Sequence, residues 1–168
     1  MKRKTPPTPD AMKLRLADLC ARSEQCEYDL RQKLTKAKIT GSDADAIITF
    51  LKDGKFVDNA RFARSYAADK CRFSAWGKYK IRAALALKRI SPPDISRALS
   101  SIPDEEWLNA ARRAGRPKAR ALDLIGEGAR EDRIKLYRFL TGRGFESALA
   151  VKVTKELAKA QKEEAEGC

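Results

Sequence analysis

The chain has 168 residues, of which 43% are hydrophobic and 35% are charged, a balance typical of a folded, highly charged protein rather than a disordered one. Its 36 lysines and arginines outnumber 23 acidic residues, and the resulting net charge of +13 favours polyanions and acidic protein surfaces as partners. The sequence has no histidine, the commonest general base, and no apolar run of the about 18 residues that a membrane span needs. We therefore expect a cytoplasmic protein that is not an enzyme and does not bind membranes.

The cysteines form no C-x-x-C pair, and they stand at Cys20, Cys26, Cys71 and Cys168. Without histidine, four zinc ligands at suitable spacing are lacking, so we expect reduced thiols and no metal site. No glycine-rich phosphate loop occurs either, and we expect no cofactor.

The first part of the chain predicts a tail followed by short helices. Residues 1–9 carry three prolines and three basic residues, which indicates a disordered tail. Asp10 can cap a helix that continues to about Glu24. The next helix should bury Leu30 and Leu34 and end before a glycine.

Further helix starts are predicted by capping residues. Ser42 and Asp45 form an S-x-x-D signal for a third helix, and Asp58 can cap a helix that continues to about Arg72. The sequence Ser-Pro-Pro-Asp at 91–94 places a capping serine before two prolines in a first helical turn.

The last third of the chain is less regular. A helix is predicted to begin near Asp104, but Gly115 and Pro117 interrupt it, so we expect a kink or a break there. Residues 125–132 are predicted to form a loop. Two further helices follow, and the polar residues at the end of the second should fray.

One apolar spacing occurs three times, at offsets of 51 and 55 residues: Leu30, Leu34, Ile39; Ile81, Leu85, Ile90; and Leu136, Leu140, Phe145. Twelve positions after each set comes another apolar residue, namely Leu51, Ile102 and Leu157. We interpret this as an all-α, elongated, curved tandem array of three three-helix repeats, because such small units need neighbours to bury their apolar faces. The predicted divisions are a tail at 1–9, repeats at 10–57, 58–102 and 103–160, and a frayed C-terminus at 161–168.

Residues 56–91 resemble the most recognisable segment of the RecX family, the bacterial regulators of the RecA recombinase. The matching positions are Phe56, Asp58, Arg61, Phe62, Ala63, Trp76, Gly77, Ile81, Leu85 and Ile90. The chain departs from the family pattern where Ser-Ala-Trp-Gly replaces the frequent Gly-Tyr-Gly-Pro, and where Gly115 and Pro117 interrupt a longer basic helix. The resemblance implies a non-enzymatic regulator that binds the RecA–DNA filament along its groove and restrains ATP hydrolysis and strand exchange. We expect the chain to act as a monomer.

Positive charge is concentrated in the middle and later parts of the chain. Residues 70–97 hold eight lysines and arginines and one acidic residue, whereas residues 12–58 hold nine lysines and arginines and eight acidic residues. This distribution suggests a basic strip for an acidic protein surface and nearby phosphate. The candidates are Lys70, Arg72, Lys78, Lys80, Arg82, Lys88, Arg89, Arg112, Arg113, Arg116, Lys118, Arg120, Arg133, Arg138 and Arg143.

The alternative function is a stand-alone, basic, helical nucleic-acid-binding protein, because three-helix units can place a helix in a major groove. Against it, the middle helices of the repeats show no clear face of base-reading side chains, and we expect DNA binding to be weak and sensitive to salt. Trp76 is expected to cover the core between helices rather than to stack on a base.

Overall fold

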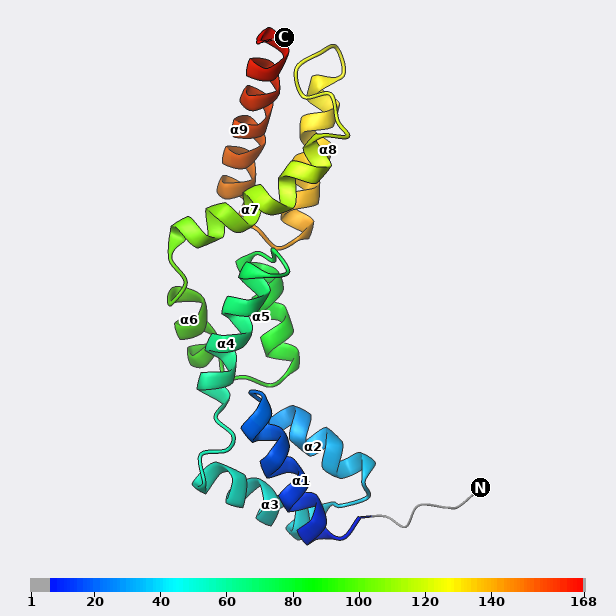
Figure 1. Cartoon of the computed structure of the whole chain (residues 1–168), viewed down its shortest axis with the longest axis vertical. Coiled ribbons are helices and arrows are strands. Elements are labelled where there is room, and N and C mark those ends of the chain that lie inside the picture. The colour runs from blue at the N-terminus through cyan, green and yellow to red at the C-terminus, as the bar shows by residue number, and fades with distance from the viewer. Residues whose placement is uncertain (1–6, 168) are drawn as a thin grey trace, which may run out of the picture. The chain divides into compact units, whose positions relative to one another are not determined.

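The computed structural model describes residues 7–167, and all regular secondary structure in this range is helical (Figure 1). The helices are α1 (Pro9–Arg22), α2 (Glu27–Lys36), α3 (Gly41–Asp53), α4 (Asn59–Arg72), α5 (Lys78–Leu87), α6 (Pro92–Ser100), α7 (Asp104–Ala119), α8 (Ala129–Gly142) and α9 (Ser147–Glu166). The predicted all-α class is confirmed. The first six residues of the predicted tail, and Cys168, lie outside the described residues.

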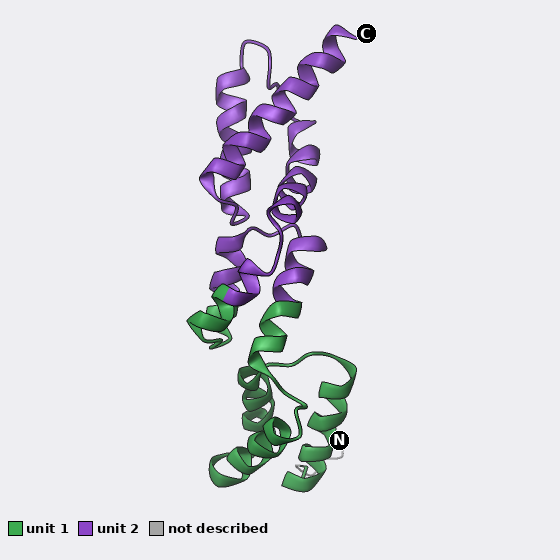
Figure 2. Ribbon diagram, turned by 90° about the vertical axis from the view of Figure 1, so that its left-hand side faces the viewer, with its two compact units in different colours: residues 1–65, 85–96 green, residues 66–84, 97–168 purple. Residues whose placement is uncertain are grey.

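The chain forms two compact units (Figure 2). Unit 1 comprises the described residues up to 65 together with residues 85–96, and unit 2 comprises residues 66–84 and those from 97 onward. Helices α4, α5 and α6 each contribute residues to both units. The division into three repeats with the predicted boundaries stays a prediction.

The core of unit 1 lies among α1, α2 and α3. Leu16, Leu30, Leu34 and Leu51 are at most 2% exposed, and Ile48 on α3 packs into the same cluster. Burying each such side chain contributes about 1.5–3 kcal/mol. Because short helices are marginally stable alone, these apolar side chains stabilise the fold only when the three helices pack together.

The core of unit 2 lies among α7, α8 and α9, each of which contacts the other two. Leu136, Leu140, Phe145 and Val153 are at most 1% exposed. Within the described residues 7–167, no helix is both long enough and apolar enough to span a membrane.

The repeated apolar spacing has a local structural cause, a helix end known as the Schellman motif. In each copy the third apolar residue donates its N–H to the carbonyl of the second: Ile39 to Leu34 at 3.0 Å, Ile90 to Leu85 at 3.2 Å, and Phe145 to Leu140 at 3.3 Å. The residue before the third has a left-handed backbone, namely Lys38 (φ 61°), Arg89 (φ 56°) and Gly144 (φ 90°). This motif satisfies carbonyls at the helix end and brings its flanking apolar residues together.

The buried positions that the spacing predicts are confirmed with one exception. All nine residues of the three sets are at most 6% exposed, and Leu51 and Ile102 are also buried. Leu157, the last of the twelve, is only half-buried on α9.

Two of the predicted helix caps are confirmed and two are wrong. Asp58 accepts the N–H of Arg61 at 2.9 Å, and Ser91 accepts that of Asp94 at 3.2 Å. At α1, Thr8 rather than Asp10 is the cap, because its hydroxyl accepts the N–H of Ala11 at 3.3 Å.

The Ser42 and Asp45 signal does not cap α3. That helix begins at Gly41 after Thr40, which makes no side-chain capping bond, and the Asp45 carboxylate instead accepts from Arg31 of α2 at 2.8 Å. An ion pair between helices has replaced the local hydrogen bond.

Of the kink or break predicted at Gly115 and Pro117, the break is wrong, since α7 continues through both residues to Ala119, and the kink stays a prediction. Pro117 stands in the last turn, where it removes a single backbone bond near an end that would fray in any case. At Gly115 a Cβ atom would come within 2.9 Å of the Leu157 side chain, so the glycine permits close packing of α7 on α9.

Both later helices extend further than predicted. Helix α8 begins at Ala129, inside the stretch read as a loop, and α9 continues to Glu166 rather than fraying from residue 161. Gln161 explains the longer α9, because its side chain accepts from Leu124 N–H at 2.7 Å and donates to the Leu122 carbonyl at 2.9 Å.

Candidate partner-binding surface

A surface hollow in unit 2, which we name the Phe73 groove, lies among the end of α4, the link that follows it, α7 and the end of α8. Its volume is about 610 Å³, and its apolar lining consists of Phe73, Ala75, Ala114, Pro117 and Phe139. The Phe73 side chain directly follows α4 and is 83% exposed. A large apolar side chain this exposed beside an apolar hollow is typical of an interaction surface.

The charged residues of the Phe73 groove are all cations: Arg72, Arg113, Lys118 and Arg143. Two of them hold the backbone at the end of α4. Arg113 donates from Nη2 to the carbonyls of Cys71 and Arg72, at 3.1 Å each. The last carbonyls of a helix lack helical partners and carry partial negative charge, so a guanidinium is favourable there.

Arg143, the residue that follows α8, binds the link after α4 in the same way. Its Nε donates to the Ala75 carbonyl at 3.0 Å, and its Nη2 donates to that of Ser74. Because the acceptors are neutral carbonyls, these bonds hold the shape of the groove without pairing Arg113 or Arg143 with an anion.

The other two cations, Arg72 and Lys118, lie near carboxylates outside the lining of the groove. Arg72 lies 3.5 Å from the Glu106 carboxylate in a half-exposed ion pair. Asp132 has its pKa lowered, mainly because Lys135 donates a hydrogen bond to it, and Lys118 adds a smaller effect. No acidic residue lines the groove.

Other predicted site residues are engaged in ion pairs or in backbone contacts. Arg112 donates to both Glu156 oxygens, at 3.0 and 3.3 Å, and these bonds raise its pKa above the ordinary value. Lys78 lies 3.4 Å from Glu146, and Arg133 donates to the Leu124 carbonyl at 2.7 Å.

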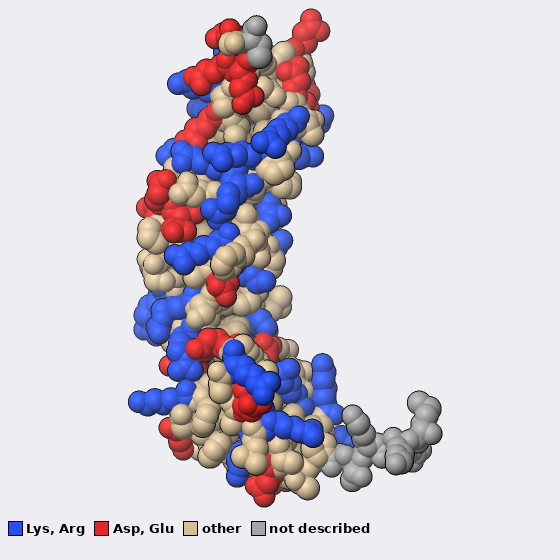
Figure 3. Space-filling view, viewed as in Figure 1, with Lys and Arg blue, Asp and Glu red and all other residues tan. Residues whose placement is uncertain are grey.

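Two lysines of the predicted strip lie against Trp76. The ammonium groups of Lys70 and Lys80 are 5.0 and 4.5 Å from the centre of its ring, within range of a cation–π interaction. Lys88 and Arg89 belong to unit 1, and the remaining candidates, Arg82, Arg116, Arg120 and Arg138, are exposed. Figure 3 shows lysines and arginines gathered around α7, with acidic side chains where α9 ends.

The structure thus brings four of the fifteen predicted residues to one hollow. Phe73, which lines that hollow, was not among the residues predicted from the sequence. Its signal was an aromatic residue outside the repeated apolar spacing, placed between basic and small residues in the stretch Lys-Cys-Arg-Phe-Ser at 70–74.

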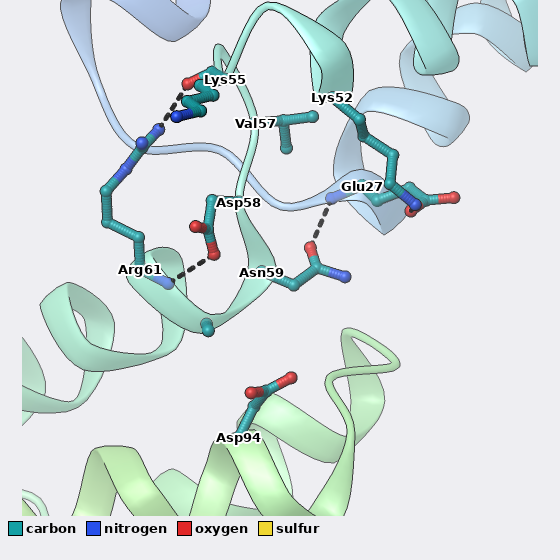
Figure 4. A pocket seen from close by; sticks show the side chains of 9 residues that line it. Glu27, Lys52, Lys55, Val57, Asp58, Asn59, Arg61 and Asp94 are labelled. Atoms are coloured by element: carbon teal, nitrogen blue, oxygen red, sulfur yellow. Dashed lines mark hydrogen bonds and ion pairs between the residues drawn. The ribbon is translucent and has the colours of Figure 1, made fainter.

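A second hollow, of about 500 Å³ in unit 1, has a different character (Figure 4). Its charged residues are three cations and three anions, namely Lys52, Lys55, Arg61, Glu27, Asp58 and Asp94. They bind one another and the backbone, as where Arg61 donates to the Lys55 carbonyl at 3.2 Å. With no excess charge and its polar groups engaged, this hollow offers little to a polyanion.

Glu27 shows how the unit 1 hollow satisfies its charges. Burial acts to raise the pKa of Glu27, but hydrogen bonds from Arg31 and Lys52 lower it below its ordinary value. The Glu27 N–H donates to the Asn59 side chain at 2.9 Å.

The described residues contain no group of three or more His, Cys, Asp or Glu side chains placed to hold a metal ion. Cys20, Cys26 and Cys71 are free thiols. Burial raises the pKa of Cys71 to about 11, so this thiol stays protonated near neutral pH and is a poor nucleophile.

Comparisons with known proteins agree on one family. The family model described as the second three-helix domain of RecX matches residues 58–99. The regulatory protein RecX of Vibrio campbellii is 28% identical over 127 residues, which cover 76% of this chain and 79% of that protein. That of Pectobacterium atrosepticum is 30% identical over 129 residues, covering 74% of this chain and 72% of that protein.

The fold is also that of a solved RecX. The crystal structure of RecX from Lactobacillus salivarius matches with a TM-score of 0.76, covering 89% of this chain and 96% of the other. Sequence identity there is 18%, so this likeness concerns the fold. On the sequence matches, the chain belongs to the RecX family of regulatory proteins.

Proposed function

We propose that this chain is a non-enzymatic, monomeric regulator that acts in the cytoplasm, binds the RecA–DNA filament along its groove and inhibits RecA ATP hydrolysis and strand exchange. Membership of the RecX family carries the proposal, because its relatives are named regulatory proteins. The Phe73 groove supports it by offering an apolar hollow edged with cations to an acidic protein surface.

The two compact units add a further argument. A chain with two units can contact two neighbouring protomers of a filament, which makes the second contact intramolecular and raises the overall affinity. A regulator that bridges protomers would restrain the changes between them that accompany ATP hydrolysis.

The test is a titration of the full chain into RecA assembled on single-stranded DNA, with ATP hydrolysis as the readout. We expect hydrolysis to fall progressively as the chain is added. Unchanged hydrolysis with full occupancy of the filament would contradict the inhibitory role, and absence of binding would contradict the proposal as a whole.

The alternative, a stand-alone nucleic-acid binder, is favoured by the exposed Arg82, Arg116, Arg120 and Arg138. Comparing bare with RecA-coated single-stranded DNA at about 150 mM salt separates the two, because affinity carried by phosphate contacts falls steeply with salt. We expect tighter binding to the coated strand. Equal affinity for both strands would favour the alternative.

A further inference from the structure

We propose that the Phe73 groove binds a short acidic segment of the partner protein, with one apolar side chain in the hollow and carboxylates on either side of it. This inference rests on the proposed function in taking the RecA filament protein as that partner. The chemistry of the segment is inferred from the groove alone.

The apolar part of the argument starts from Phe73. Its ring is 83% exposed, and Pro117, Ala114 and the half-buried Phe139 line the hollow beside it. An apolar side chain placed there would remove Phe73 and its own surface from water, which is the main source of binding free energy at such an anchor.

The cationic part of the argument concerns Arg113 and Arg143. Both hydrogen bonds of Arg113 come from Nη2, so among the described residues its Nε and Nη1 have no acceptor. The bonds of Arg143 come from Nε and Nη2, which leaves Nη1. These guanidinium groups are already fixed by the backbone that they hold, so a carboxylate can pair with them at a low cost in side-chain entropy.

A peptide fits this arrangement better than a nucleic acid does. Non-specific binding of a single strand needs a basic track along the backbone and a series of aromatic faces for successive bases. Here the cations surround one hollow, and Phe73 is the single exposed aromatic residue in its lining. One apolar anchor between carboxylates matches both features.

The first test measures binding by fluorescence anisotropy, using a labelled peptide of alternating aspartate and glutamate with one central leucine. Matched probes replace the leucine by serine, or the peptide by single-stranded oligothymidylate of equal charge. We expect the leucine peptide to bind at least about tenfold more tightly than the serine peptide, as the loss of one buried side chain predicts.

Variants then locate the binding. Phe73→Ala and Lys118→Ala should each weaken leucine-peptide binding by about fivefold to tenfold. Leu87→Ala and Lys152→Ala, at exposed positions outside the groove, should change it by less than about twofold. Thermal unfolding of all four variants confirms that each is folded.

The outcomes separate this inference from the proposed function. Equal binding of the two peptides, or equal effects of groove and control variants, would overturn the peptide site. Oligothymidylate binding that depends on Phe73 would overturn it in favour of a nucleic-acid site. If the peptide binds as expected while RecA ATP hydrolysis stays unaffected, the groove stands and the RecA proposal fails. If the peptide does not bind and Phe73→Ala leaves inhibition of RecA intact, the peptide site fails and the RecA proposal stands.

Discussion

In unit 1 the start of α2 meets the turn between α5 and α6 through side chains. Lys88 lies 2.6 Å from the Asp29 carboxylate, and the Arg89 guanidinium lies 5.3 Å from the centre of the Tyr28 ring. Lys88 also lies over the Phe62 ring. We call this contact the polar joint.

In unit 2 the start of α5 meets the turn between α8 and α9 through the backbone. Gly77 donates its N–H to the Arg143 carbonyl at 2.9 Å, and Tyr79 donates to that of Gly144 at 3.0 Å. A Cβ atom on Gly77 would lie 2.2 Å from the Gly144 backbone, and one on Gly144 would lie 2.4 Å from Lys80 N. We call this contact the glycine joint.

The two joints occupy corresponding positions in the repeated spacing, since Tyr28 and Tyr79 are 51 residues apart and Arg89 and Gly144 are 55 apart. The same arrangement of helices is therefore held by charge in one place and by steric fit in the other. The polar joint should respond to salt and tolerate changes in size, whereas the glycine joint should show the opposite behaviour.

The largest expected effect comes from Gly77→Ala. The added Cβ cannot fit 2.2 Å from backbone atoms that have no freedom to move away, so the glycine joint must open. We expect a loss of about 3 kcal/mol or more in the free energy of unfolding, measured by urea denaturation and circular dichroism.

Gly142→Ala is the matched control, because it lies at the end of α8 and a Cβ there would meet nothing within 4 Å. It should be neutral or slightly stabilising, since alanine favours the helix. Should Gly77→Ala prove as harmless as this control, close backbone packing does not hold the joint.

An intermediate effect is expected at the polar joint from Lys88→Met. Lys88 and Asp29 are about one-quarter and one-third exposed, so their ion pair is partly shielded from water. We expect the substitution to reduce the free energy of unfolding by about 1 kcal/mol at low salt, and by less as salt is added.

A double-mutant cycle with Asp29→Asn isolates the pair, because each single change leaves the other charge without this partner. Urea denaturation at two salt concentrations measures the coupling. A coupling that salt leaves unchanged would show that packing of Lys88 on Phe62, rather than charge, holds the joint.

The sequence was informative where one residue type has one structural meaning. Leu30, Leu34 and Leu51 could be placed in the core from spacing alone, because an apolar residue at a repeated helical position has few other places to go. Asp58 and Ser91 could be predicted as helix caps because each bonds to a backbone N–H only three residues away.

The sequence was misleading where long-range contacts decide the outcome. The Asp45 carboxylate accepts from Arg31 on another helix instead of capping its own helix, and Gly115 permits α7 to pack on Leu157 of α9 instead of breaking the helix. The site shows the same limit. A row of arginines does not reveal that Arg113 and Arg143 bind carbonyls beside Phe73, because that contact joins residues about forty and seventy positions apart.

The smallest effect concerns the left-handed residue that stands before the third apolar residue in each copy of the repeated helix end. Lys38 and Arg89 have φ values of 61° and 56°, and the corresponding residue of the third copy is Gly144. A residue with a Cβ is less stable than glycine in this conformation by about 1 kcal/mol. Lys38→Gly should therefore raise the free energy of unfolding by about 0.5–1 kcal/mol. Arg89→Gly should gain less, because it also removes the contact with Tyr28, worth about 0.5–1 kcal/mol. Thermal unfolding of the two variants side by side measures the difference, and equal gains would mean that the Arg89–Tyr28 contact contributes nothing to the polar joint.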